Sequence, residues 1–312
     1  MHATLAELLH TPPAGASAPF DDLAAWWPHW QALQSTADSP VALALRCGWA
    51  ADRIGWAFAG GYQAALRALL PSLAGERLAA LCVTEAGGNR PRDIATRIAP
   101  QPDGMLRIDG EKRWTTLGPQ SATLLVVGAW SPAGAEPAGR PALRVVRVES
   151  ATPGVQLQPM PPTRFVPEVP HAGVLLTDVR VSASALLPGD GYEAVVKPFR
   201  TVEDVHVMLA IGAWLLREAR ARAWPSAFAE RLVAALALLA ELAAAETLAA
   251  TTHVALAGAL QWLAPLFAEA GERFAAAGDA VAARWPRDAA LLQVAGAARA
   301  QRAARAWERL GG

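Results

Sequence analysis

The sequence predicts an α+β fold made of a helical part, then a β-rich part, then a helical bundle. Two long stretches, residues 1 to about 78 and about 193 to 310, are rich in Ala and Leu at helical spacing. The stretch between them consists of short segments rich in β-branched residues and separated by turn formers. Because strands and helices are segregated, we expect separate layers and not alternating βαβ units.

Three domains follow from these changes of texture. We predict an N-terminal helical domain over residues 1–78, a middle antiparallel β-barrel or β-sandwich over 79–190, and a C-terminal helical bundle over 191–312. In the first domain Ser39–Leu70 reads as helical, with Trp49 and Trp56 two turns apart on one face. In the last domain, breaks at Trp224-Pro225, Gly271, Gly278 and Trp285-Pro286 predict four or five helices.

The middle domain reads as a series of short strands. Asp109-Gly110 lies between two of them and is a strong signal for a two-residue hairpin. The candidate strands are Leu78–Thr84, Ile94–Ala99, Met105–Ile108, Lys112–Thr116, Thr123–Trp130, Ala142–Val148, Val155–Gln158 and Val174–Val181.

Composition excludes several classes of function. The 312 residues are 53% hydrophobic and 18% charged, and 28 Lys plus Arg balance 28 Asp plus Glu. A neutral chain without a basic stripe predicts no nucleic-acid partner. Cys47 and Cys82 have no CxxC spacing, so we expect buried thiols and neither a disulfide framework nor a metal site. No signal peptide is apparent, and the apolar run Leu232–Ala240 is shorter than the roughly 20 residues of a membrane span. We therefore expect a soluble, cytoplasmic protein without a membrane partner.

Two motifs in the middle domain have a specific order. Leu81–Gly88 (LCVTEAGG) is a strand that runs into a glycine turn, and Ile108–Thr116 (IDGEKRWTT) follows about 25 residues later. This pair resembles the acyl-CoA dehydrogenase family, which has a TEPG-type turn after one strand and an NGxKxWIT-type segment after it. Gly60–Gln63 (GGYQ), Leu176–Val181 (LTDVRV) and Arg287–Val294 (RDAALLQV) resemble further segments of that family in the same order. The match covers most of residues 40 to 302.

The resemblance implies a flavin site in the middle domain, with FAD as the cofactor. By resemblance, Trp114 packs against the flavin, Thr116 bonds near its reactive nitrogen, and Thr84 contacts its pyrimidine end. The residues are compatible with this, since a planar ring needs an aromatic wall and a few hydrogen-bonding groups. Trp114 and Thr116 alternate on a strand, which places them on one face. Sheet residues without a ligand are the alternative interpretation.

The acid–base machinery of the family is changed in this chain. Family dehydrogenases use a carboxylate to remove the α-proton of a CoA thioester, and the two positions where they place it correspond here to Gly296 and Val205. Glu203 and Asp204 lie just before Val205 and are our candidate catalytic residues. Glu203 and His206, three residues apart, share a helix face and are able to form a titrating pair. An acid cluster near the start of a helix is the alternative for these residues.

Three functions remain open from the sequence. The first is an FAD-dependent oxidoreductase of the acyl-CoA dehydrogenase type acting on an acyl thioester, with an oxygen-using flavin oxidase or monooxygenase as a variant. The second is a non-catalytic or half-site subunit that pairs with a complete homologue in a hetero-oligomer. The third is a degenerate scaffold that binds neither flavin nor CoA. By analogy with the family, we expect a homodimer, a homotetramer or a pair with a homologous subunit.

Overall fold

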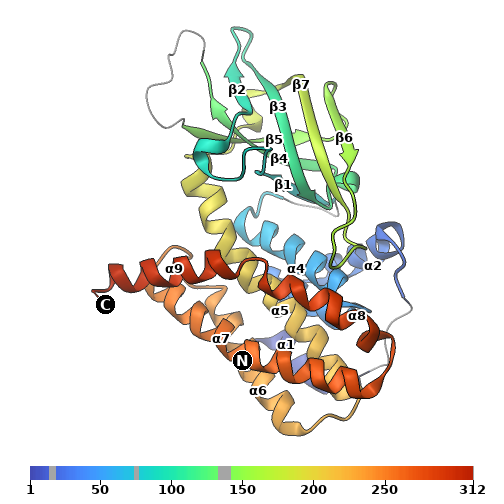
Figure 1. Cartoon of the computed structure of the whole chain (residues 1–312). Coiled ribbons are helices and arrows are strands. Elements are labelled where there is room, and N and C mark those ends of the chain that lie inside the picture. Colours follow the sequence, from blue (N-terminus) through green and yellow to red (C-terminus); the bar gives the residue numbers. More distant parts are fainter. Residues whose placement is uncertain (14–18, 74–76, 133–141, 312) are drawn as a thin grey trace. The chain divides into compact units, whose positions relative to one another are not determined.

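The structure is a computed structural model that describes residues 1–13, 19–73, 77–132 and 142–311 (Figure 1). It divides into two compact units. One unit comprises residues 1–68, 163–168 and 201–312, and the other comprises residues 69–162 and 169–200. The N-terminal and C-terminal helices, which we predicted as separate domains 1–78 and 191–312, therefore belong to one helical unit, and the β unit has most of 79–190.

The N-terminal part of the helical unit begins with α1 (Ala3–His10) and α2 (Leu23–Thr36). The expected helical stretch 39–70 is two helices, α3 (Pro40–Ala50) and α4 (Ile54–Leu69), because the backbone is extended at Ala51. Both helices approach α5 closely at glycines. A Cβ on Gly48 would lie 1.9 Å from the carbonyl oxygen of Ala210, and one on Gly61 would lie 2.7 Å from the Cα of Val207. Small residues at these crossings bring the N-terminal and C-terminal helices into one core.

The described C-terminal part has five helices, within the predicted four or five: α5 (Lys197–Ala221), α6 (Ser226–Leu242), α7 (Ala250–Ala277), α8 (Ala280–Asp288) and α9 (Gly296–Arg309). Two predicted breaks are wrong, since Gly271 lies within α7, where it makes room for the indole of Trp285, and Trp285-Pro286 lies within α8. The apolar run Leu232–Ala240 lies within α6, whose buried side chains include Leu232, Leu236 and Leu239. One described helix, α7, is long and apolar enough to cross a membrane by length and composition alone, a test that core helices of soluble proteins also pass. This helix packs against α6, α8 and α9.

The β unit is a seven-stranded curled sheet in the order β1-β4-β2-β3-β7-β6, with β5 paired to β4. The fold class predicted from the sequence is confirmed, but the sheet is mixed and not purely antiparallel, because β4 pairs in parallel with both β1 and β2. The strands are β1 (Ala79–Cys82), β2 (Arg97–Pro100), β3 (Met105–Thr116), β4 (Thr123–Trp130), β5 (Leu143–Glu149), β6 (Val155–Pro159) and β7 (His171–Ser182).

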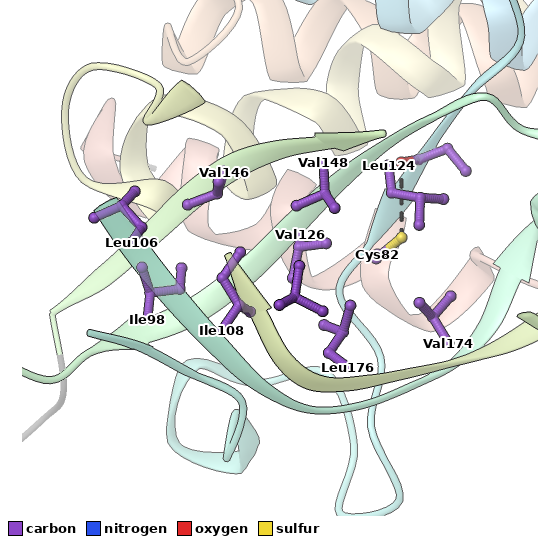
Figure 2. Close-up of a cluster of buried hydrophobic side chains, with 12 residues drawn as sticks. Cys82, Ile98, Leu106, Ile108, Leu124, Val126, Val146, Val148, Val174 and Leu176 are labelled. Atoms are coloured by element: carbon purple, nitrogen blue, oxygen red, sulfur yellow. Dashed lines mark hydrogen bonds between the residues drawn. The ribbon is translucent and has the colours of Figure 1, made fainter. Parts of the chain in front are cut away.

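The core of this sheet is aliphatic (Figure 2). Alternating positions on each strand point into it, as the period of two in the sequence requires. Cys82 belongs to this cluster, and both it and Cys47 are buried free thiols, as predicted. The labelled side chains come from six strands: Cys82, Ile98, Leu106, Ile108, Leu124, Val126, Val146, Val148, Val174 and Leu176.

The predicted hairpin at Asp109-Gly110 is wrong. β3 runs continuously through this dipeptide and pairs with β7 along its length, with an irregular register between Ile108 and Gly110. Gly110 has a φ of +154°, and a Cβ there would lie 2.4 Å from the hydroxyl oxygen of Thr96. Gly110 thus allows β3 to approach the segment before β2 closely, which is a second reason, besides turns, for glycine to occur in a strand.

Candidate functional site

A buried ion pair anchors the part of the β unit that contains the predicted flavin residues. The ammonium of Lys112, which is 0% exposed, lies 2.5 Å from the carboxylate of Glu85. Glu85 also accepts hydrogen bonds from the backbone N–H of Ala95 (2.7 Å) and from both the backbone N–H (3.1 Å) and the hydroxyl (2.7 Å) of Thr96. One carboxylate therefore ties together the turn after β1, the segment before β2, and β3.

Burial and charge act in opposite directions on this pair. Burial by itself raises the pKa of Glu85, but the charge of Lys112 and the hydrogen bonds from Lys112, Thr96 and Ala95 outweigh it and hold the pKa below its ordinary value. Burial lowers the pKa of Lys112, and the charge of Glu85 offsets only part of this effect. The carboxylate is thus held as an anion by its neighbours.

Two residues beyond Lys112, β3 has a bulge. Lys112 pairs with Val174 and Thr115 pairs with Ala172, so one extra residue lies on the β3 side. Trp114 accommodates the extra residue by adopting a φ of +57°. This left-handed conformation is rare for a large side chain and typical of functional sites. The bulge alters the strict strand alternation that we assumed for Trp114 and Thr116.

The backbone amides of the bulge bond outside the β3–β7 ladder. Arg113 donates its N–H to the carbonyl of Thr84 at 2.7 Å, and Trp114 donates its N–H to the sulfur of Met160 at 3.1 Å. The first bond places Thr84 next to the bulge. The structure therefore brings together the three predicted flavin residues, Thr84, Trp114 and Thr116.

The exposed groups at the bulge fit a planar ligand with polar edges. The indole of Trp114 is 47% exposed although it is one of the largest apolar side chains of the β unit. The hydroxyls of Thr84 and Thr116 are part-buried, and neither has a hydrogen-bond partner within the described ranges. An open aromatic surface and hydroxyls on the neighbouring backbone are compatible with a planar ring that has polar edges. We call Thr84, Trp114 and Thr116 the bulge platform.

Sequence reasoning missed other residues around the platform. Glu85 and Lys112 were inside the quoted motifs without a role, and Met160 and His171 were not singled out. One signal was present: Leu106, Ile108 and Lys112 share the buried phase of β3, so a lysine was directed into the core and required a partner. Nothing in the sequence indicated that Met160 would meet the bulge.

The two candidate catalytic residues lie in the helical unit, on α5. Asp204 is buried, and both its oxygens are engaged: Arg299 contacts Oδ1 at 2.7 Å, and Arg302 contacts Oδ2 at 2.6 Å. Both oxygens of this carboxylate are therefore occupied by guanidinium groups, and the contacts join α5 to α9. This geometry favours a structural role for Asp204.

Glu203 is half-buried and keeps its place as the other candidate. Its predicted partner His206 is almost fully buried, and the Nδ1 of His206 bonds the carbonyl of Val202 at 2.8 Å. Burial lowers the pKa of His206 to about 4, with the Val202 bond opposing. His206 is thus neutral at physiological pH. Among the described residues, no group of three or more His, Cys, Asp or Glu side chains is able to hold a metal ion.

Comparison with solved structures identifies the fold. FMN-bound TdsC from Paenibacillus sp. A11-2 matches with a TM-score of 0.71 and 18% identity, over 96% of this chain and 93% of that one. Butyryl-CoA dehydrogenase from Megasphaera elsdenii matches with a TM-score of 0.66 and 17% identity, over 97% and 89%. Glutaryl-CoA dehydrogenase from Mycobacterium smegmatis matches with a TM-score of 0.64 and 15% identity, over 94% and 91%.

No protein-family model matches the chain, and no curated protein matches it in sequence. The structural likeness nevertheless covers nearly the whole chain. The chain therefore has the acyl-CoA dehydrogenase fold, and the resemblance found in the sequence motifs is confirmed at the level of the fold.

Removal of one partner of the buried pair should be more costly than removal of both. We expect Glu85→Gln to lower the free energy of unfolding by about 3 kcal/mol, because it leaves a buried ammonium without a counter-charge. The double variant Glu85→Gln/Lys112→Met should recover most of that loss, because it removes the ammonium while the glutamine oxygen still accepts from Ala95 and Thr96. Urea denaturation of the single and double variants measures the difference. Glu193→Gln, which breaks the exposed pair of Glu193 with Lys197 (2.7 Å), is the control and should change little. Equal losses for the single and double variants would contradict the proposed anchor.

The same pair has a pH signature. The pKa of Glu85 is lower in the folded chain than in the unfolded one. The contribution of Glu85 to the free energy of unfolding is therefore complete above about pH 4.5 and is lost as the pH falls through the folded-state pKa. Over that acid range, the stability of Glu85→Gln should fall less steeply than that of the wild type.

Substitution of Asp204, which Arg299 and Arg302 contact, distinguishes a structural role of this carboxylate from a catalytic one. We expect Asp204→Asn to lower the free energy of unfolding by about 2 kcal/mol, because two partly buried guanidinium groups lose their counter-charge. Glu7→Gln, which breaks the exposed pair of Glu7 with Arg46 (3.0 Å) in the same helical unit, is the control and should have a smaller effect. Thermal unfolding of both variants measures this. A stable Asp204→Asn protein that had lost only turnover would show that Asp204 is the base.

Proposed function

We propose that the chain is an FAD-dependent oxidoreductase that acts on an acyl thioester. The observation that carries the proposal is the bulge platform, in which the exposed indole of Trp114 is held in a strained backbone conformation at the bulge that Thr84 and Thr116 flank in the backbone. The structural neighbours support it, since they include an FMN-bound protein and two acyl-CoA dehydrogenases. We propose FAD from the sequence resemblance, and the FMN-bound neighbour makes FMN the flavin to test beside it.

Each residue of the platform has a defined task in this proposal. Trp114 supplies an apolar wall for the ring, and the hydroxyls of Thr84 and Thr116 bond its polar edge. A bound flavin supplies a hydride acceptor. The Glu85–Lys112 pair acts through the backbone: it holds the turn after β1 against β3, the two segments that carry the platform, so the side chains need little reorganisation when the ligand binds.

Proton abstraction from the substrate requires a carboxylate, and we propose Glu203 for it. Asp204 is engaged by Arg299 and Arg302, and the nearby imidazole of His206 is neutral and bonded to Val202. We choose Glu203 for its place in the sequence, two residues before Val205, which stands where the family places its base. An oxygen-using reaction on the same platform would not need this base.

A second candidate function is that of a half-site subunit. It is favoured by Val205 and Gly296 at the two positions where the family places its base, and by the clamped state of Asp204. In this case the chain pairs with a homologous subunit that provides the base. Otherwise we propose a homodimer or homotetramer, and for either assembly a cytoplasmic location without nucleic-acid or membrane partners.

The absorbance spectrum of the purified protein tests the proposal, recorded anaerobically before and after a panel of acyl-CoA thioesters is added. We expect a flavin band, as purified or after incubation with FAD or FMN, and bleaching by at least one thioester. Glu203→Gln should keep the band and lose the bleaching. A band that no thioester bleaches would favour the oxygen-using variant. Failure to bind either flavin would overturn the stand-alone enzyme and leave the half-site subunit, which is then tested by adding the homologous chain.

A further inference from the structure

His171 lies beside the bulge platform and was not assigned a role by the sequence. It is the first residue of β7 and pairs in register with Thr116 of the platform. Its imidazole meets the indole of Trp114 edge-on, with ring centroids 6.0 Å apart and planes at 70°. Met160, whose sulfur accepts the N–H of Trp114, donates its own N–H to the carbonyl of His171 at 2.9 Å. The backbone of His171 is therefore bonded to Met160 and paired with Thr116, and its ring contacts the indole of Trp114.

The imidazole of His171 is neutral at physiological pH and retains one nitrogen for a further proton. Burial lowers its pKa, and a hydrogen bond to the backbone of Val169 opposes this. A neutral imidazole has one N–H, so donation to the Val169 carbonyl leaves the other nitrogen as the acceptor.

Few charged side chains of the β unit lie on the elements that pack against the imidazole of His171. β6 and the turn η2 (Gly118–Gln120), which pack against β7, contain no titratable side chain. β3 contains Glu111 and Arg113, both exposed, Lys112, whose ammonium lies on Glu85, and Arg107 and Asp109, which pair with each other at 2.8 Å toward the other end of the strand. No charged group contributes to the lowered pKa of His171. The charge of a ligand on Trp114 would therefore be felt directly by this imidazole.

We propose that His171 is a further contact of the bulge platform and is the group that takes up a proton when a flavin bound there becomes negatively charged. The inference rests on the proposed function, since it requires a flavin at Trp114. After two electrons and one proton have reduced the flavin to its monoanion, His171 accepts a second proton from solvent on its free nitrogen. The resulting imidazolium faces the anion and stabilises the reduced form.

NMR of the histidine Cε1–H resonances tests this inference without reference to turnover. The His171 signal is assigned by its loss in His171→Gln, or in His171→Asn if the first variant does not fold. Its titration is recorded for the protein alone, with FMN or FAD bound, and after anaerobic reduction by dithionite. We expect the midpoint to rise by about one pH unit or more between the oxidised and reduced complexes, as an opposite charge nearby requires. His10, on α1 of the helical unit, is the internal control and should not move.

The outcomes separate the inference from the proposed function. A bound flavin whose reduction leaves the His171 midpoint unchanged would overturn the role of His171 and leave the flavin platform intact. No binding of either flavin would overturn both. A midpoint that rises for His10 as much as for His171 would indicate a general effect of charge or ionic strength and would also overturn the inference.

Discussion

The ion pair of Glu85 with Lys112 is the constraint on which the β unit and its platform depend. Lys112 is fully buried, and a buried ammonium without a partner would cost several kcal/mol. Glu85 meets that need and also accepts three hydrogen bonds from Ala95 and Thr96. The turn after β1 is thereby held against β3 and the segment before β2, and the neighbouring Thr84 carbonyl is in place to accept the N–H of Arg113.

The bulge at Trp114 follows from this arrangement. Once Arg113 and Trp114 direct their N–H groups to Thr84 and Met160, they no longer extend the ladder with β7, and Trp114 adopts positive φ. Such a conformation costs of the order of 1–3 kcal/mol and persists only where the surroundings fix it. The result is a large indole left 47% exposed. The strain and the exposure are both unfavourable for the empty fold, which is why we assign the bulge to ligand binding.

The sequence predicted the fold well because its periodicities report on burial. Alternation of apolar residues located the strands of the β unit, and breaks such as Trp224-Pro225 located the helices. The prediction was wrong where one dipeptide has two possible causes. Asp109-Gly110 is typical of a hairpin, but here the glycine makes room for Thr96 within one continuous strand. The platform was found only through ordered motifs. Its support by Glu85 and Lys112, and the clamp of Arg299 and Arg302 on Asp204, depend on contacts between residues far apart in the chain, which no local pattern contains.

The most direct test of the account is the affinity of the purified protein for FAD and FMN when Trp114 is replaced by alanine. If the exposed indole is the wall of a flavin site, Trp114→Ala should weaken binding about tenfold or more, which corresponds to roughly 1.4 kcal/mol of lost ring contact. Trp262→Ala, which removes an equally exposed indole (53%) from α7 of the helical unit, should bind as the wild type does. Equal flavin affinity of wild type and Trp114→Ala would contradict the central claim, because the strained and exposed indole would then have no part in binding.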